Sequence, residues 1–164
     1  MAWRSRRRRY AKQWLLLIGI VIVCGWLTTK GLQMLFATGR AEEAEHVVDE
    51  FYKLEQEGDY GSSWELLHSS MKEQYPKDHY IQQRAHIFMQ DFKSESYLYE
   101  VGKSKPVSHF SLKENDKETE LEQVYAVEVT QDFDTLYGPI QLVQMCYVAE
   151  ENGEWSMLWK TSKE

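Results

Sequence analysis

Apolar residues form one continuous run near the start of the chain and periodic patterns after residue 40. From Gln13 to Thr29 the 17 residues carry no charge, and apolar character resumes after Lys30 as GLQMLFA. In a helix the uncharged run spans roughly 25 Å, slightly less than the hydrocarbon thickness of about 30 Å. Lys30 can extend its side chain toward the interface and let the next residues contribute. The pattern predicts a transmembrane anchor over 14–36.

A cleaved signal peptide is the competing interpretation of this segment. Ala37-Thr38-Gly39 loosely satisfies the small-residue rule for cleavage. That site would lie about ten residues past the uncharged core, with Lys30 in between, so the spacing favours an uncleaved anchor. Both interpretations predict that the rest of the chain is exported.

The pattern after residue 40 is first helical. Apolar residues recur at spacings of three and four between Arg40 and Gly58, which predicts an amphipathic helix that Gly58 ends. Asp59 or Ser62 can cap a second helix that buries Trp64 and Leu67, before Ser69 and Ser70 interrupt it. Pro76 suits the first turn of a third helix. Its apolar stripe contains Tyr80, Ile81, Arg84, Ile87 and Phe88.

From Tyr97 onward the pattern alternates, as in strands. Strands are predicted at 97–101, 107–112, 125–133 and 140–149, with a solvated loop at 113–119 and a break at Gly138-Pro139. The 140–149 strand is apolar on both faces, which is typical of a central strand. Asn152-Gly153 predicts a type I′ hairpin turn. After that turn one face of the last strand carries Trp155, Met157 and Trp159.

Helices followed by antiparallel strands indicate an α+β domain at 41–162, with about three helices packed on the sheet. At 164 residues the chain has room for one such core beside the anchor. We therefore expect three parts, namely a basic head at 1–13, the anchor at 14–36 and the α+β domain.

Charge is divided unevenly along the chain. The first acidic residue is Glu42, and 11 basic and 26 acidic residues follow Arg40, a formal charge of −15. By the positive-inside rule the head stays in the cytoplasm and the acidic domain lies outside the cell membrane. The acidic domain also argues against a nucleic-acid partner. The orientation rests on six basic residues of the head, Arg4, Arg6, Arg7, Arg8, Arg9 and Lys12.

Two segments resemble a known superfamily. HVVDEFYKLEQEGDYGSSWELL (46–67) looks like the opening of nuclear transport factor two-like domains, and CYVAEENGEWSMLW (146–159) is similar to their final hairpin. The resemblance is greatest to the extracytoplasmic, non-catalytic N-terminal domain of methicillin-resistance penicillin-binding proteins. It implies a cone-like fold with a curved antiparallel sheet. Those proteins continue into a transpeptidase, whereas this sequence stops at Glu164, so we expect that activity to be absent.

Candidate chemical groups show no spacing that selects a catalytic pair. The superfamily's use of an acid or histidine for proton transfer directs attention to Asp91, His86 and His109, but they follow no motif. His79 and His86 lie two helical turns apart, too far to share a metal ion unaided. We expect no metal and no cofactor. Four aromatic residues could line a pocket, although core packing is the favoured interpretation: Trp64, Phe88, Tyr125 and Trp159.

The two cysteines fall in separate regions and predict no disulfide, with Cys24 in the anchor and Cys146 as a small buried apolar residue. Taken together, these features predict a non-catalytic, single-pass interaction domain of a bacterial cell envelope. Its expected partner is another envelope protein or a cell-wall component, and self-association stays open. One alternative is a subunit of an envelope-spanning secretion or conjugation assembly. Another is a small-molecule-binding or isomerase-like cone.

Overall fold

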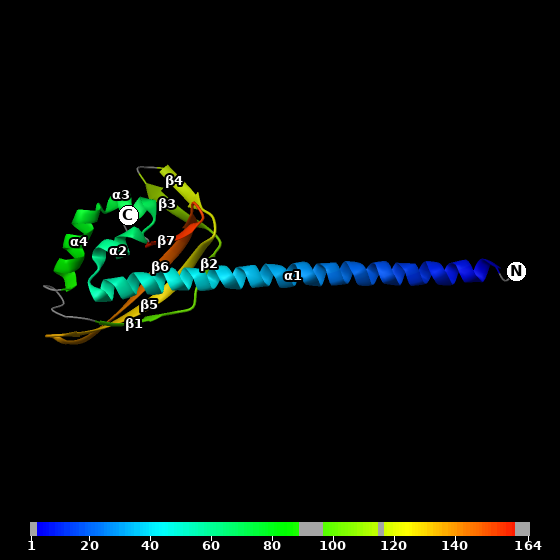
Figure 1. Cartoon of the computed structure of the whole chain (residues 1–164), viewed down its shortest axis with the longest axis horizontal. Coiled ribbons are helices and arrows are strands. Elements are labelled where there is room, and N and C mark those ends of the chain that lie inside the picture. The colour runs from blue at the N-terminus through cyan, green and yellow to red at the C-terminus, as the bar shows by residue number, and fades with distance from the viewer. Residues whose placement is uncertain (1–2, 89–96, 115–116, 160–164) are drawn as a thin grey trace. The chain divides into compact units, whose positions relative to one another are not determined.

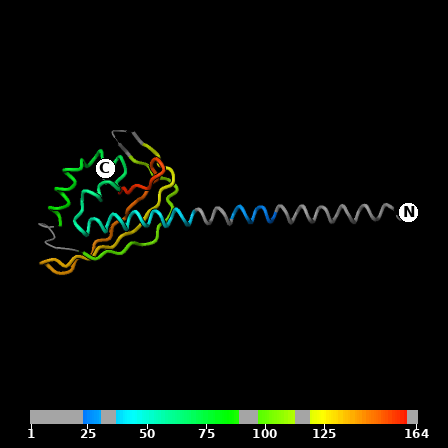
Figure 2. Tube along the Cα trace, viewed as in Figure 1, coloured from blue at the N-terminus to red at the C-terminus, as the bar shows by residue number. Residues whose placement is uncertain are grey.

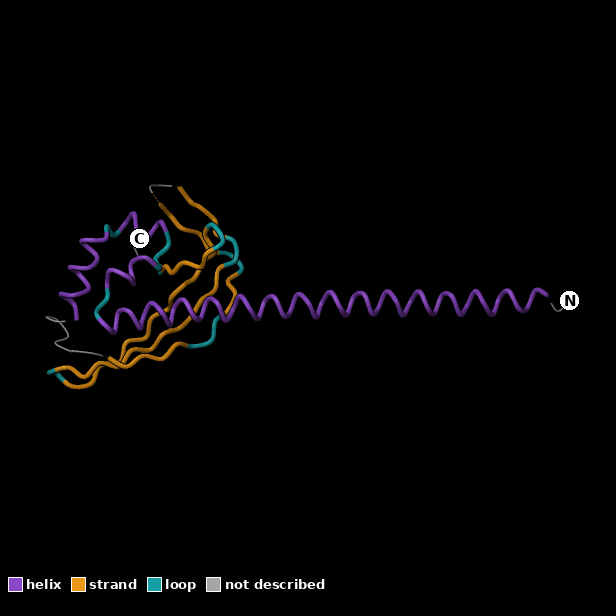
Figure 3. Tube along the Cα trace, viewed as in Figure 1, coloured by secondary structure: helices purple, strands orange, loops and turns teal. Residues whose placement is uncertain are grey.

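The structure, a computed structural model, describes the backbone of residues 3–88, 97–114 and 117–159. Side chains are described for 23–30, 37–88, 97–112 and 119–159 (Figure 1). The chain divides into two compact units, Met1–Arg40 and Ala41–Glu164. Helix α1 (Trp3–Glu57) begins in the first unit and ends in the second (Figure 3).

The backbone of the predicted anchor at 14–36 is helical. The side chains of 14–22 and 31–36 lie outside the described residues, as do those of the basic head at 1–13. Within the described part of the chain, no helix is long and apolar enough to cross a membrane.

In the second unit, α1 packs against the sheet through the stripe that its spacing predicts. Ala44, Val48 and Phe51 are buried on that stripe. The helix ends before Gly58, which has φ +78°. Glycine adopts this left-handed conformation without steric cost, so Gly58 ends the helix as predicted.

Three shorter helices follow: α2 (Tyr60–Glu65), α3 (Ser69–Gln74) and α4 (Lys77–His86). Asp59 caps α2 as predicted, because its Oδ1 accepts a hydrogen bond from the Ser62 amide at 3.0 Å. The prediction of an interruption at Ser69 and Ser70 was wrong. His68 caps a helix there, since its Nδ1 accepts a hydrogen bond from the Ser70 amide at 3.2 Å.

The main sheet is antiparallel and has the order β1-β5-β6-β7, with β2 also paired to β5. Its strands are β1 (Tyr97–Val101), β2 (Lys105–Val107), β5 (Val124–Thr135), β6 (Gly138–Glu151) and β7 (Glu154–Leu158). The turn between β6 and β7 is the predicted one, with φ +55° at Asn152 and +87° at Gly153. The helices and this sheet make the second unit an α+β domain, as predicted.

The region between β2 and β5 differs from the prediction of one strand at 107–112 and a loop at 113–119. Two strands, β3 (Phe110–Glu114) and β4 (Lys117–Leu121), form a separate two-stranded sheet. Phe110 is buried, and its ring centroid lies 4.6 Å from that of Tyr147 on β6. Pairing with β3 gives strand structure to β4, although the polar composition of 113–119 predicts a loop.

The two faces of the main sheet are covered differently. Tyr125, Val127, Val129 and Phe133 of β5 are buried on the helix-covered inner face, as predicted. Met157 of β7 is buried on the same face. The opposite face of β7 was expected to be polar, but Leu158 there is fully buried. Leu158 is paired with Tyr147, which Phe110 covers, so the β3–β4 sheet shields this part of the outer face.

Candidate functional site

A buried carboxylate links three helices. The Glu55 side chain on α1 is fully buried, and its Oε1 accepts hydrogen bonds from Ser63 Oγ at 2.6 Å and Tyr80 Oη at 2.7 Å. Its Oε2 accepts one hydrogen bond from the Nε of Arg84 on α4. The same oxygen forms an ion pair with the Arg84 guanidinium. Every oxygen of this acid is therefore bonded within the domain, which makes the cluster a structural junction and not a poised acid or base.

A second group of polar atoms lies between α1 and β6. The Tyr52 hydroxyl lies 3.2 Å from the Cys146 Sγ and donates to Gln144 Oε1 at 3.2 Å. Burial raises the pKa of the Cys146 thiol to about 11, because the charged thiolate would lose its water. Cys146 is therefore the small buried residue that the sequence predicts, without a reactive thiolate at neutral pH.

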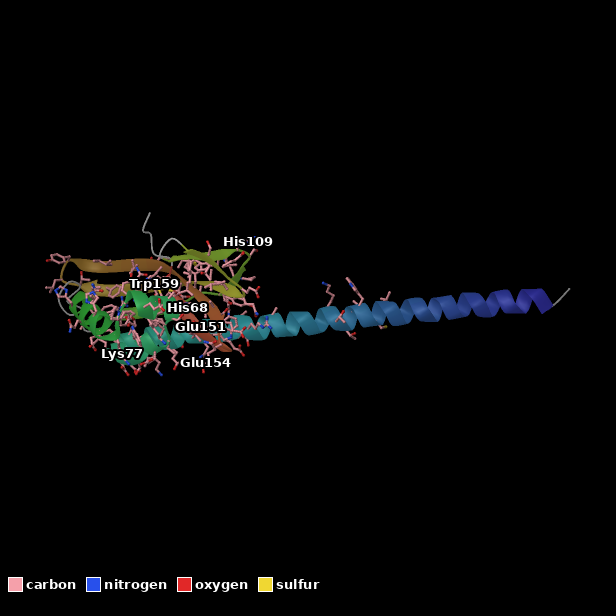
Figure 4. All side chains as sticks on the ribbon, turned by 90° about the horizontal axis from the view of Figure 1, so that it is seen from above. His68, Lys77, His109, Glu151, Glu154 and Trp159 are labelled. Carbon is pink, nitrogen blue, oxygen red and sulfur yellow. The ribbon has the colours of Figure 1, made fainter. Side chains whose placement is uncertain are left out.

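His68, Ser70 and Glu151 come together at the start of α3, as Figure 4 shows for His68 and Glu151. His68 Nδ1 lies 2.8 Å from Ser70 Oγ, and its Nε2 lies 3.9 Å from the Glu151 carboxylate. The same Nδ1 accepts a hydrogen bond from the Ser70 amide. The Ser69 hydroxyl donates a hydrogen bond to the Glu151 carboxylate at 2.6 Å. These residues cap a helix and attach it to the β6–β7 hairpin, so a nucleophilic role has no support from their geometry.

Of the residues predicted from the superfamily's chemistry, the structure describes His86 and His109, and these lie at different elements. His86 ends α4, whereas His109 precedes β3, and Figure 4 shows His109 apart from His68 and Glu151. His109 and Phe110 line an open depression of about 450 Å³ with Ser111 and Glu120. Asp91 lies outside the described residues. Among the described histidine, cysteine and acidic side chains, no group of three could hold a metal ion.

The four predicted pocket aromatics each have packing partners in the domain. Phe88 stacks on Tyr97 and Phe133, and Tyr125 contacts Trp155 edge to face. Trp159 contacts Phe51 and Tyr75, whereas Trp64 donates to the Tyr75 carbonyl and lies beneath Lys72 and Lys77. Phe88 and Tyr125 belong to the buried core, and Trp64 and Trp159 are half-buried against it.

The most unusual surface lies along β6. This strand has 14 residues, but β7 pairs only with Tyr147–Glu151. On the side away from β5, no other described residue pairs with Gly138–Cys146, which we call the β6 edge. The prediction of a central strand at 140–149 is confirmed by the sheet order, in which β6 lies between β5 and β7, but among the described residues only Tyr147–Ala149 of this range have partners on both sides. The sequence pattern describes side chains but not the length of the neighbouring strand.

Large apolar side chains are exposed along the β6 edge and at the turn before it. Val143 is 55% exposed, and Ile140, Leu142 and Met145 are exposed by 40–43%. Leu136 and Tyr137 form the tip of the β5–β6 hairpin and are 73% and 86% exposed. Figure 2 shows this orange hairpin at one end of the sheet. An unpaired strand edge with an apolar surface is a template for pairing with another chain. We take the β6 edge and this tip as the candidate interaction site.

One buried polar group lies on the inner face at this end of the sheet. Gln131 of β5 is 2% exposed, and its amide nitrogen has no hydrogen-bond partner among the described residues. It is paired in register with Leu142, which is itself 42% exposed. The helical cover of the inner face therefore becomes incomplete beside the β6 edge.

The sequence contains one signal of this site that its periodicity does not reveal. Residues 138–149, GPIQLVQMCYVA, carry no charge in a domain with a formal charge of −15. Natural edge strands are commonly protected by charged residues.

No family model matches the chain, and no curated protein is similar enough to count as a match.

Proposed function

We propose that this chain is a membrane-tethered, extracytoplasmic interaction domain of a bacterial cell envelope, which acts by binding another protein and not by catalysis. The observation that supports the proposal is the β6 edge, nine uncharged residues with exposed apolar side chains. Edges of this kind bind extended segments by adding a strand to the sheet. A cone-like nuclear transport factor two-like fold is the architecture we propose for the domain.

The tether supports the same function. The 17 uncharged residues from Gln13 to Thr29, with six basic residues before them, favour an anchor with a cytoplasmic N-terminus. Confinement to one membrane raises the effective concentration of neighbouring partners. A strand edge of modest affinity then suffices for a specific contact.

The described polar clusters are better suited to structure than to chemistry. Glu55 is held by Ser63, Tyr80 and Arg84, and Glu151 is held by Ser69. A general base needs a free lone pair within reach of substrate. Binding is therefore the better explanation of the exposed features of this domain.

The test is site-specific photo-crosslinking of the full chain in its native membrane. A photoreactive amino acid at Val143 should form a position-specific adduct with another protein chain. The control position is Gln82, which is exposed on α4 away from the β6 edge. Equal adducts at both positions, or adducts at neither, would contradict binding through this edge.

A further inference from the structure

The strand pairing shows which backbone groups along the β6 edge have no partner strand among the described residues. Glu151 and Glu154 flank the two-residue turn as a hydrogen-bonded pair, so alternate residues from Glu151 backward direct their backbone groups away from β5. The register with β5 runs without a bulge from Ala149 to Gly138. The same alternation therefore directs four residues to the free side: Pro139, Gln141, Val143 and Met145.

We propose that a second copy of this chain occupies the β6 edge, with the two β6 strands antiparallel and centred on Leu142. This inference rests on the proposed function, because it names the partner of the same site. In this register Gln141 pairs with the partner's Val143, and Met145 with the partner's Pro139. The outward N–H groups of Gln141, Val143 and Met145 in each copy then each have an acceptor on the partner strand. Pro139 is the fourth outward residue, and it has no N–H that needs an acceptor.

The length of the free edge selects this register. Centring on Leu142 places Gly138 opposite the partner's Cys146, so the whole stretch overlaps with itself. If the pairing were centred on Val143 instead, Pro139 would lie opposite the partner's Tyr147. The outward backbone groups of Tyr147 are already directed to β7. Pairing with a second copy in this register satisfies two identical free edges in one two-fold symmetric contact, which a strand of unrelated sequence does not do.

Charge favours the same edge over the other side of the sheet. Two copies with a formal charge of −15 each repel one another, and the uncharged stretch 138–149 is where they can approach with the least repulsion. The opposite edge, formed by β1 and β2, carries the charged residues Glu100 and Lys105, which are typical protection against pairing.

The expected contact is small. Pairing in this register supplies about six hydrogen bonds, which at the usual density corresponds to roughly 600–1,200 Å² of buried surface. That area is at or below the lower limit of stable interfaces. Dimers should therefore form between copies confined to one membrane and dissociate in dilute solution.

The test uses disulfide crosslinking of the full chain in membranes, in a Cys24→Ser background. In the proposed register Leu142 faces the partner's Leu142 in a non-hydrogen-bonded pair, with Cα atoms about 4.5 Å apart. The two copies of Ile140 are displaced by four residues, or about 14 Å, beyond disulfide reach. Leu142→Cys should therefore give about tenfold more crosslinked dimer under mild oxidation than Ile140→Cys, because only the former meets the geometric limit.

A second pair of variants tests the backbone contact. Val143→Pro, added to Leu142→Cys, removes an outward N–H and should abolish the crosslink without breaking a bond to β5. Val143→Thr keeps both the N–H and the branched shape and should retain it. No dimer with Leu142→Cys, equal dimer with Ile140→Cys, or a crosslink that survives Val143→Pro would overturn the inference. If Val143 meanwhile captured a different protein by photo-crosslinking, the proposed function would stand and only the second copy would be wrong.

Discussion

At the scale of single residues, Glu55 has the greatest structural consequence. It lies on α1, whereas Arg84 lies 29 residues later on α4, and their ion pair is shielded from solvent on the acid side. Burial disfavours the charged guanidinium, but the Glu55 charge outweighs it and leaves the pKa of Arg84 raised. The arginine is therefore charged in the folded domain, and removal of Glu55 leaves it without its counter-ion.

Glu55→Ala should destabilise the domain by about 3–5 kcal/mol, because it leaves a largely buried arginine unpaired. Urea unfolding of residues 41–164 measures this change in the free energy of unfolding. Glu57→Ala is the matched control, since Glu57 is an exposed acid on the same helix, and it should change stability by less than about 0.5 kcal/mol. A similar small effect for both variants would show that the ion pair does not hold α1 to α4.

At the scale of elements, the loop between α2 and α3 is fastened to the β6–β7 hairpin. The His68 amide donates to the Met157 carbonyl at 2.9 Å, and the Met157 amide donates to Leu66 at 2.8 Å. Ser69 adds hydrogen bonds to Glu151 through its amide and its hydroxyl. These contacts fix the start of α3 and explain why a serine pair that predicts an interruption begins a helix instead.

The pH dependence of this attachment follows from Glu151. Burial alone would raise its pKa, but hydrogen bonds from Ser69, with the nearby His68 and Lys72, outweigh burial and hold the pKa below the ordinary 4.5. A lowered folded-state pKa contributes stability above the unfolded value, and this contribution is lost as pH falls through the folded value. Glu151→Gln should therefore cost stability at pH 5–6, and its difference from wild type should shrink below about pH 4.5.

Thermal unfolding across this pH range measures the difference between wild type and Glu151→Gln. Glu150→Gln provides the control, because Glu150 is an exposed carboxylate next to the same turn. A difference that persists unchanged as the pH falls well below 4.5 would show that the carboxylate charge does not secure the hairpin.

At the scale of the whole molecule, the proposed topology gives a direct labelling prediction. In a Cys24→Ser background, a cysteine introduced at exposed Glu150 should react with a membrane-impermeant maleimide in intact cells. A cysteine at Ser5, in the basic head, should react only after lysis. Cys146 is buried with a raised pKa and should add little background. The reverse pattern of labelling would place the acidic domain inside the cell.

The sequence alone determined the features that depend on near neighbours along the chain. Gly58 ends a helix, Asp59 caps the next, and Asn152-Gly153 forms a turn, because backbone conformation and capping bonds act within a few residues. The alternation of β5 likewise identified its buried face, since strand side chains point to opposite faces in turn.

Only the tertiary structure decided the features that depend on distant partners. The pairing of Glu55 with Arg84, and the packing of Phe110 on Tyr147, join segments about 30 or more residues apart. The candidate site is of this kind, because β6 is an edge only along the part that no described residue of β7 reaches. Apolar residues on both faces are compatible with a central strand or an exposed edge. The physical difference is whether another strand satisfies the backbone groups, and a single strand's sequence does not contain that information.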